Sequence, residues 1–188
     1  MNTPTHAIVN LALLARGRGA SHAPAVLIGA IAPDLLMVVF WLWVRFGEGL
    51  GEGAIWSEAY FRPGWQRVFD SAHSLPLAVV GVGVAVATRR PAVAFGLASM
   101  ALHDLGDLGL HREDGHRHMF PLSDWRYLSP VSYWDPAYYG ALAAGAELAL
   151  LFGGSWMLWR RFEGRTSRVA LVSVSGLALV LYLGFYCA

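Results

Sequence analysis

Residues 102–111 place four ionisable side chains in an otherwise apolar stretch: His103, Asp104, Asp107 and His111. In an α-helix, His103 and Asp107 lie one turn apart and share a face, whereas Asp104 points about 100° away. An imidazole and a carboxylate at this spacing can hold a single cation between them. His111 continues the same face by one further turn. The spacing therefore predicts a cation site on one helix, with Asp104 beside it.

The composition places this cluster in a membrane protein. Hydrophobic residues make up 56% of the 188 residues and charged residues only 14%, and the mean hydropathy is +0.45, whereas an ordinary soluble domain has about 25% charged residues. In lipid, each ionisable group costs roughly 2.5–3.5 kcal/mol unless a partner compensates it, so the cluster carries more weight than the same spacing on a wet surface. The net charge of +1 gives no reason to expect nucleic-acid binding. The single cysteine, Cys187, excludes an intrachain disulfide and a metal cluster held by several thiolates.

The hydrophobic pattern predicts an all-α, polytopic membrane helix bundle that forms a single integral-membrane domain over residues 1–188. The expected membrane segments are residues 4–15, 24–46, 71–88, 92–110, 137–159 and 169–186. The first is short for a span at about 1.5 Å per residue. In the second, Pro33 predicts a kink or break, because proline removes a backbone donor and crowds the preceding turn. Residues 47–70 are expected to form a loop with one interfacial helix.

Arginines are unevenly distributed between the two sides of this alternating arrangement. One side collects Arg16, Arg18, Arg89, Arg90, Arg160, Arg161, Arg165 and Arg168, with Glu163 as its one acidic residue. The other side holds Arg45, Arg62, Arg67, Arg112, Arg117 and Arg126, together with eight acidic residues. By the positive-inside rule the first side is cytoplasmic, and both termini are therefore expected outside the cytoplasm.

On this topology, seven ionisable residues from five segments can converge from the outer half of the membrane: His6, Asp34, His73, His103, Asp107, His111 and Glu147. Imidazole nitrogens and carboxylate oxygens form a ligand set that suits zinc, manganese or iron. A bound metal can generate hydroxide near neutral pH and polarise a carbonyl or phosphoryl oxygen, which fits a hydrolase. Asp104 can orient a ligating histidine or act as general base. For Glu147, helix–helix hydrogen bonding and a proton relay are alternatives to a metal or catalytic role.

The longest polar loop holds Arg112, Arg117 and Arg126 beside the expected site. Guanidinium groups suit phosphate or carboxylate groups of a substrate, and the alternative is ion pairing with the acidic residues of the same loop. His116 and His118 also lie in this loop. We interpret them as solvated residues or as substrate contacts, the latter for His118 in particular. Metal ligation is a further alternative.

Several short motifs, in this order, resemble a family of predicted bacterial membrane-bound metal-dependent hydrolases. The motifs are Thr5-His6, Pro33-Asp34, His73-Ser74, His103 with Asp107, Phe120-Pro121-Leu122 and Trp125-Arg126-Tyr127. The family includes a LexA-regulated inner-membrane member and is similar in its ligand pattern to zinc-dependent phospholipases C. The resemblance covers roughly residues 5–130. It implies a multi-helix hydrolase of the bacterial inner (plasma) membrane, with His6, Asp34, His73, His103 and Asp107 as metal ligands.

The chain departs from this family pattern at two places. Leu36 and Met37 stand where members often carry aspartate and histidine. Members also often carry a His-Arg pair shortly before a Thr-His-Ser motif, and the corresponding stretch of this chain, which ends at Asp70, lacks that pair. A second metal would then require Asp70 or Glu147 as a substitute ligand.

These observations predict an enzyme that uses a divalent metal, with zinc first and manganese or iron as alternatives, to hydrolyse an ester or phosphoester of a lipid or lipid-linked substrate at the extracytoplasmic face. The alternative is an ion or proton transporter or channel lined by Asp34, His103, Asp107 and Glu147, and a catalytically silent scaffold is a third possibility. A transport route needs polar residues in both halves of the membrane. The cytoplasmic halves of these segments are almost purely apolar, which favours a site open to one side.

Overall fold

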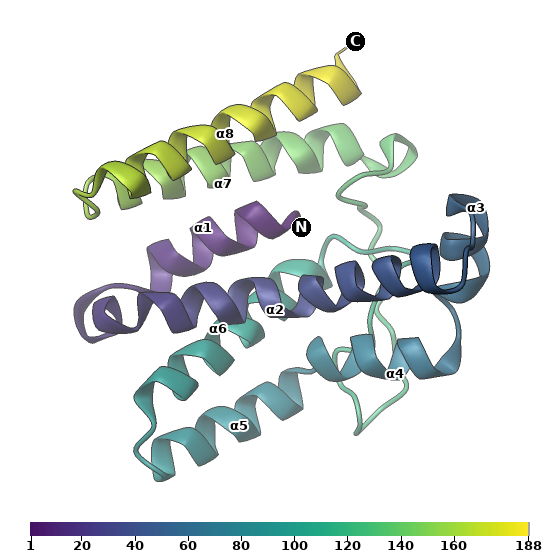
Figure 1. Ribbon diagram of the computed structural model, residues 1–188, viewed down its shortest axis with the longest axis horizontal. Helices are drawn as coiled ribbons and strands as arrows, with labels where there is room; N and C mark the ends of the chain where they lie inside the picture. Colours follow the sequence, from purple (N-terminus) through teal and green to yellow (C-terminus); the bar gives the residue numbers. More distant parts are fainter. Residues whose placement is uncertain (188) are drawn as a thin grey trace.

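The computed structural model describes residues 1–187, which form helices and connecting loops without a strand (Figure 1). Their order is α1 (Thr3–Leu14), η1 (Gly17–His22), α2 (Ala23–Leu42), η2 (Trp43–Gly47), α3 (Glu52–Ala54), η3 (Ile55–Ala59), α4 (Pro63–Ala72), α5 (Leu75–Ala87), α6 (Pro91–Leu108), η4 (Pro136–Tyr138), α7 (Gly140–Trp159) and α8 (Arg165–Tyr186). The predicted all-helical class is confirmed, and each of the expected membrane segments is helical over most of its length.

Within residues 1–187, three helical segments are long and apolar enough to cross a membrane: Gly17–Gly47, Gly140–Trp159 and Arg165–Tyr186. The pair α4 and α5, bent by 46° at the break between them, meets the same test when taken together. Helix α1 has 12 residues and is about 18 Å long, shorter than a hydrocarbon core of about 30 Å. The structure is therefore consistent with a membrane protein.

The helices lie in a stack in which α1 separates the α7–α8 pair from α2, and α6 joins α2 to α5 (Figure 1). The connections α1–α2, α5–α6 and α7–α8 lie at one end of this stack. The start of α7 and the long loop that follows α6 lie toward the other end, and the N-terminus lies nearer the middle (Figure 1). Polar side chains also join the helices inside the stack: Asn10 donates to the Ser99 carbonyl (2.8 Å), and the Ser99 hydroxyl donates to the Val26 carbonyl (2.7 Å).

Helix α2 continues through Pro33, so the predicted break does not occur. Proline interrupts the local hydrogen-bond ladder, but carbonyls near such a site can find partners on neighbouring helices. Here the carbonyl of Ala30, three residues earlier, accepts a hydrogen bond from His103 Nδ1 at 2.8 Å. The proline-containing turn is thus tied to α6.

Two further expectations need correction in part. Residues 47–70 are expected to form a loop with one helix, and they contain α4 together with additional short helical turns, which enclose an aromatic core around Phe40, Tyr60 and Phe69. The segment expected from residue 137 begins with the short η4, which Asp135 caps by accepting from the Ala137 N–H at 2.9 Å. Tyr139 then adopts a left-handed conformation (φ 63°), so α7 begins three residues later than expected.

Close contact between α2 and α6 depends on Gly29. A Cβ atom at this position would lie 2.0 Å from the Gly96 carbonyl oxygen, and backbone atoms cannot rotate away as a side chain can. Gly83, within α5, is surrounded by open space, and a Cβ atom there would have no heavy atom within 4 Å. These two glycines therefore form a matched pair for testing the packing.

We expect Gly29→Ala to lower the free energy of unfolding by about 1–3 kcal/mol, the usual cost of overpacking. Gly83→Ala is the control and leaves stability unchanged or slightly raised, because alanine is the better helix former. Thermal unfolding in detergent, followed by circular dichroism, measures both. Equal melting temperatures for the two variants would contradict the described α2–α6 contact.

Candidate metal centre

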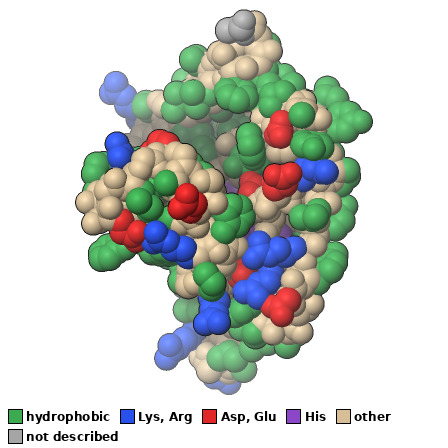
Figure 2. Space-filling view, turned by 90° about the vertical axis from the view of Figure 1, so that its right-hand side faces the viewer, with side chains coloured by type: hydrophobic (Ala, Val, Ile, Leu, Met, Phe, Trp, Pro, Cys, Tyr) green, Lys and Arg blue, Asp and Glu red, His purple; other side chains and the backbone are tan. Residues whose placement is uncertain are grey.

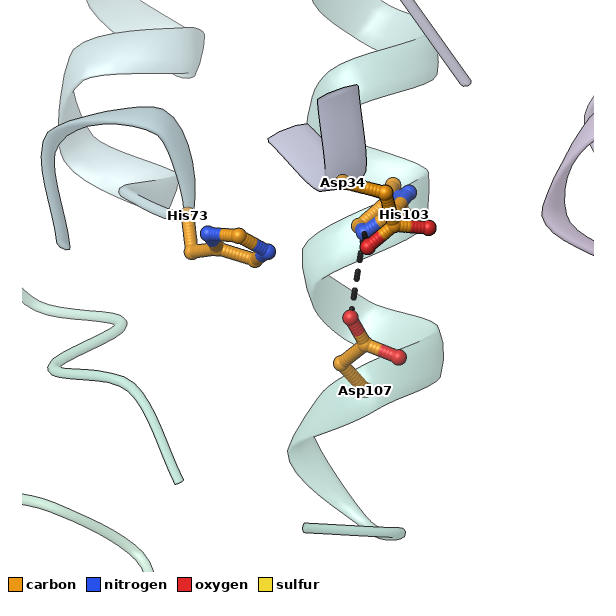
Figure 3. A group of neighbouring side chains, drawn as sticks. All are labelled: Asp34, His73, His103 and Asp107. Carbon is orange, nitrogen blue, oxygen red and sulfur yellow. Dashed lines mark ion pairs between the residues drawn. The ribbon is translucent and has the colours of Figure 1, made fainter. Parts of the chain in front are cut away.

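Four side chains from three places in the chain meet inside the stack, near the end that carries the long loop after α6: Asp34 of α2, His73 at the end of α4, and His103 and Asp107 of α6 (Figure 3). Each offers one ligand atom, and these four atoms lie within 4.8 Å of one another. His73, His103 and Asp107 are buried, and the Asp34 side chain is 24% exposed. This group could hold a metal ion.

Backbone carbonyls fix the tautomers of both imidazoles. His73 Nδ1 lies 2.9 Å from the Phe69 carbonyl oxygen, and His103 Nδ1 lies 2.8 Å from that of Ala30. A carbonyl oxygen only accepts, so each Nδ1 carries a proton and each neutral ring has its lone pair on Nε2. This is the arrangement by which second-sphere carbonyls usually orient histidines that bind a metal.

His103 Nε2 faces two carboxylates. This nitrogen lies 3.0 Å from Asp107 Oδ2 and 3.6 Å from Asp34 Oδ1. In the neutral tautomer it is an acceptor that faces two other acceptors in a buried place, which is unfavourable. Either a proton on Nε2 or a metal ion shared with the carboxylates relieves the conflict, and the donor set of two imidazoles and two carboxylates fits a divalent metal.

Asp107 is the centre of a wider group of contacts. Its Oδ1 lies 2.5 Å from the Met1 amino group, 2.9 Å from His6 Nε2 and 3.4 Å from His111 Nε2. His6, a predicted ligand, also stacks on His103 with ring centroids 3.6 Å apart. His6 thus lies against the four-residue group rather than within it, and its ligand role stays a prediction.

His111 occupies a different environment from the other histidines near Asp107. Its Nδ1 lies 3.0 Å from Asp114 Oδ2. Burial lowers the pKa of His111, but hydrogen bonds to Asp107 and Asp114 outweigh burial and raise this pKa to about 9. The same contact lowers the pKa of Asp114, against the effect of its burial. Since His111 is held between two carboxylates, it is better suited to neutralise charge than to bind a metal, and its predicted ligand role gains no support.

The two predicted catalytic carboxylates lie outside the four-residue group. Asp104 is buried, and within residues 1–187 neither of its carboxylate oxygens has a hydrogen-bond partner. Glu147 of α7 accepts from the Asn2 N–H at 2.6 Å and from Asn2 Nδ2 at 3.0 Å. This is the helix–helix role named as an alternative for Glu147, and it ties the start of α1 to α7.

The loop arginines have mainly structural partners. Arg117 donates to the buried Asp70 from its backbone N–H (2.9 Å) and from Nε (2.6 Å). Arg126 donates to the Gly115 carbonyl (2.9 Å) and to Gln66 Oε1 (2.8 Å). Both therefore fix the loop onto α4, whereas the sequence predicts substrate binding for them. Asp70 is engaged in this way and does not belong to the four-residue group.

A cavity of about 780 Å³ opens beside the group, and it is lined by Asp34 and Asp107 together with Arg112, His116 and aromatic side chains such as Trp56 and Tyr133. Figure 2 looks onto this end of the molecule, where acidic and basic side chains surround a recess. Arg112 is the one arginine among the described lining residues. Its guanidinium lies 3.9 Å from the Tyr138 ring centre and donates to the Ser129 carbonyl. Because Arg112 lines the cavity, it is the one arginine of the three for which the structure supports the predicted substrate binding.

The interpretation of His116 and His118 as solvated residues is wrong, because both are buried. His116 stacks on His73 with ring centroids 3.9 Å apart. Burial lowers the pKa of His118 and holds that of His116 well below its usual range, so both rings are neutral. The sequence shows the residue types. The burial of both rings accompanies the contact between Arg117, which lies between them, and Asp70, which is far away in the chain.

Six of the seven histidines thus form one continuous group of rings, made of His6, His73, His103, His111, His116 and His118. His22 lies apart and stacks on Phe95. Comparisons with protein-family models, with curated proteins and with solved structures gave no match. The class of protein therefore rests on the fold and the site: a helical protein with membrane-spanning candidates and a buried Asp/His group that could hold a metal ion.

We expect the purified protein to bind one divalent metal ion per chain, and the double substitution His103→Ala with Asp107→Ala to abolish this binding. His22→Ala, a histidine variant outside the group, retains it. Metal content is measured by mass spectrometry after dialysis against zinc or manganese. Protein that takes up neither metal, or a double variant with stoichiometric metal, would overturn the assignment.

We also expect Arg117→Ala to loosen residues 115–120, because it removes the guanidinium that donates to the buried Asp70 carboxylate and leaves Arg126 at 3.8 Å as the remaining one. Breaking a fully buried pair costs about 3–5 kcal/mol. Arg126 and the partial exposure of Arg117 reduce this cost, and amide hydrogen exchange in the segment still becomes faster. Arg67→Ala, on the exposed face of α4, serves as control. Unchanged exchange in residues 115–120 would show that other contacts hold the loop.

Proposed function

We propose that the protein is a membrane-embedded, metal-dependent hydrolase that acts on an ester or phosphoester of a lipid-like substrate at the extracytoplasmic face. The observation that carries the proposal is the convergence of two imidazoles with fixed tautomers and two carboxylates beside a cavity of about 780 Å³. A site of this size suits a small-molecule group.

Zinc fits the donor set best, with manganese and iron as alternatives, since neutral imidazoles and carboxylates suit all three. A metal held by these residues would supply a bound water with a pKa of about 7 and would polarise a carbonyl or phosphoryl oxygen. Residues of the chain bind the metal and the substrate. His73 and His103 present Nε2, Asp34 and Asp107 supply negative charge, and Arg112 binds the anionic part of a substrate from the cavity wall.

The lipid-like substrate is supported by the location of the site. The cavity lies at the end of a stack that contains three membrane-span candidates, and Trp56, Tyr133 and Trp134 line it. Tryptophan and tyrosine are enriched at membrane–water interfaces. A substrate that stays anchored in the bilayer could therefore present its ester at this depth.

The proposed topology has six membrane segments and places both termini outside the cytoplasm of a bacterial inner membrane. The arginine-rich turns α1–α2, α5–α6 and α7–α8 lie at one end of the stack (Figure 1), which the positive-inside rule assigns to the cytoplasm. The metal group lies near the opposite end. A reporter fused after residue 188 should then be active outside the cytoplasm.

Membership of the predicted membrane-bound metal-dependent hydrolases is part of the same proposal. The proximity of Asp34, His73, His103 and Asp107 supports it, because these are four of the five ligands that the resemblance implies. The alternative of a transporter has less support. On the far side of the group, α1, α2 and α6 are joined by hydrogen bonds of Asn10 and Ser99 and by the Gly29–Gly96 contact, which leave little room for a path.

We expect the zinc-loaded protein to hydrolyse p-nitrophenyl butyrate or bis-p-nitrophenyl phosphate, and the His103→Ala and Asp107→Ala double variant to be inactive. Arg112→Ala raises KM for an anionic substrate by about ten- to a hundredfold, since a hydrogen bond to a charged group is worth about 1.5–3 kcal/mol. Arg160→Ala, at the other end of the stack, is the control. Activity that persists in the double variant would contradict the proposal.

A further inference from the structure

A second cavity, of about 720 Å³, lies between α1, α7 and α8. Its walls are mostly aliphatic, with Leu148 and Leu151 from α7 and Leu177, Ala178 and Leu181 from α8. None of the described lining residues is an arginine. This volume is within the range of about 300–1,000 Å³ that is usual for ligand sites, and the composition fits a hydrocarbon rather than a charged group.

The apolar cavity adjoins the cavity of the metal centre. Asn2, Tyr133 and Trp134 line both of them. These residues form the boundary between a polar space that contains Asp34 and Asp107 and a space with aliphatic walls. One amphiphilic molecule could therefore occupy both, with its polar end at the metal group and its tail between the helices.

Contacts between α7 and α8 frame the apolar cavity. At its inner end, the Ser155 and Ser175 hydroxyls are hydrogen-bonded at 3.1 Å. At its outer end, the Tyr186 hydroxyl donates to the Trp134 carbonyl at 2.9 Å. Glu147 is the one acidic residue among the described lining residues, and its carboxylate is already engaged by Asn2. These contacts tie α8 to α7 and to the loop that precedes α7. The cavity itself is open along α8, where Leu177 and Leu181 are 61% and 62% exposed, so a chain could enter it from the side.

We infer that the cavity between α1, α7 and α8 binds an acyl chain of the substrate and so makes the enzyme selective for long-chain over short-chain esters. This inference rests on the proposed hydrolase function and specifies its substrate class. Side chains that line the shared boundary, Tyr133 and Trp134, then separate the ester from the tail. The acyl chain positions the ester at the metal group instead of leaving it free in the bilayer.

The test compares p-nitrophenyl esters of butyrate and decanoate, each below its micellar concentration, with zinc-loaded full-length protein in nanodiscs. For the wild type, kcat/KM rises with chain length, by up to about fourfold for each methylene that is removed from water. Ala178→Trp fills the cavity from α8 and brings the ratio for decanoate over butyrate close to one. Val172→Trp, on an exposed face of α8 outside the cavity, is the control and keeps the wild-type ratio.

A second measurement does not depend on turnover. A decanoic acid probe with a terminal diazirine should label residues of α7 or α8 that line the cavity, and Ala178→Trp but not Val172→Trp should suppress this labelling. The inference is overturned if the wild type shows no chain-length preference, if Ala178→Trp leaves the ratio unchanged, or if labelling lies elsewhere. Labelling at the cavity without hydrolysis of either ester would refute the hydrolase proposal and leave an acyl-binding site.

Discussion

The arrangement of the helix ends around the four-residue group depends on the buried carboxylate of Asp107. It is 1% exposed, and a charge in such a place is costly unless cations or hydrogen-bond donors surround it. The Met1 amino group and three imidazoles, those of His6, His103 and His111, lie within 3.4 Å of its oxygens. Neutralising this one carboxylate thus brings together the start of α1, the end of α6 and the loop that follows it.

Polar contacts elsewhere serve the same purpose of placing a few ligand atoms inside an apolar protein. Pro33 disturbs the backbone of α2, and the nearby Ala30 carbonyl accepts from His103. Asp70 holds the loop through Arg117, and the loop in turn buries His116 against His73. Each of these contacts gives a buried polar group a partner and also fixes the orientation of a side chain near the four-residue group.

In the proposed enzyme, the two cavities bind different parts of the substrate. The polar one contains the acidic and imidazole groups that metal chemistry needs, and the aliphatic one matches the tail of an amphiphile. They share a boundary at Tyr133 and Trp134, at the end of the stack where aromatic residues would meet the membrane surface. A substrate could then enter sideways from the bilayer, without leaving it.

The sequence by itself determined the helical class, the approximate ranges of the helices and the common face of His103 and Asp107, because these depend on local periodicity. The topology and the order of the motifs also predicted that Asp34, His73, His103 and Asp107 come together, and they do. Other distant pairings were decided only by the tertiary structure. It paired Arg117 with Asp70 and Glu147 with Asn2, buried His116, and carried α2 through Pro33 without a break. Each of these outcomes depends on a partner that is remote in the chain, and residue type and spacing contain no information about such a partner.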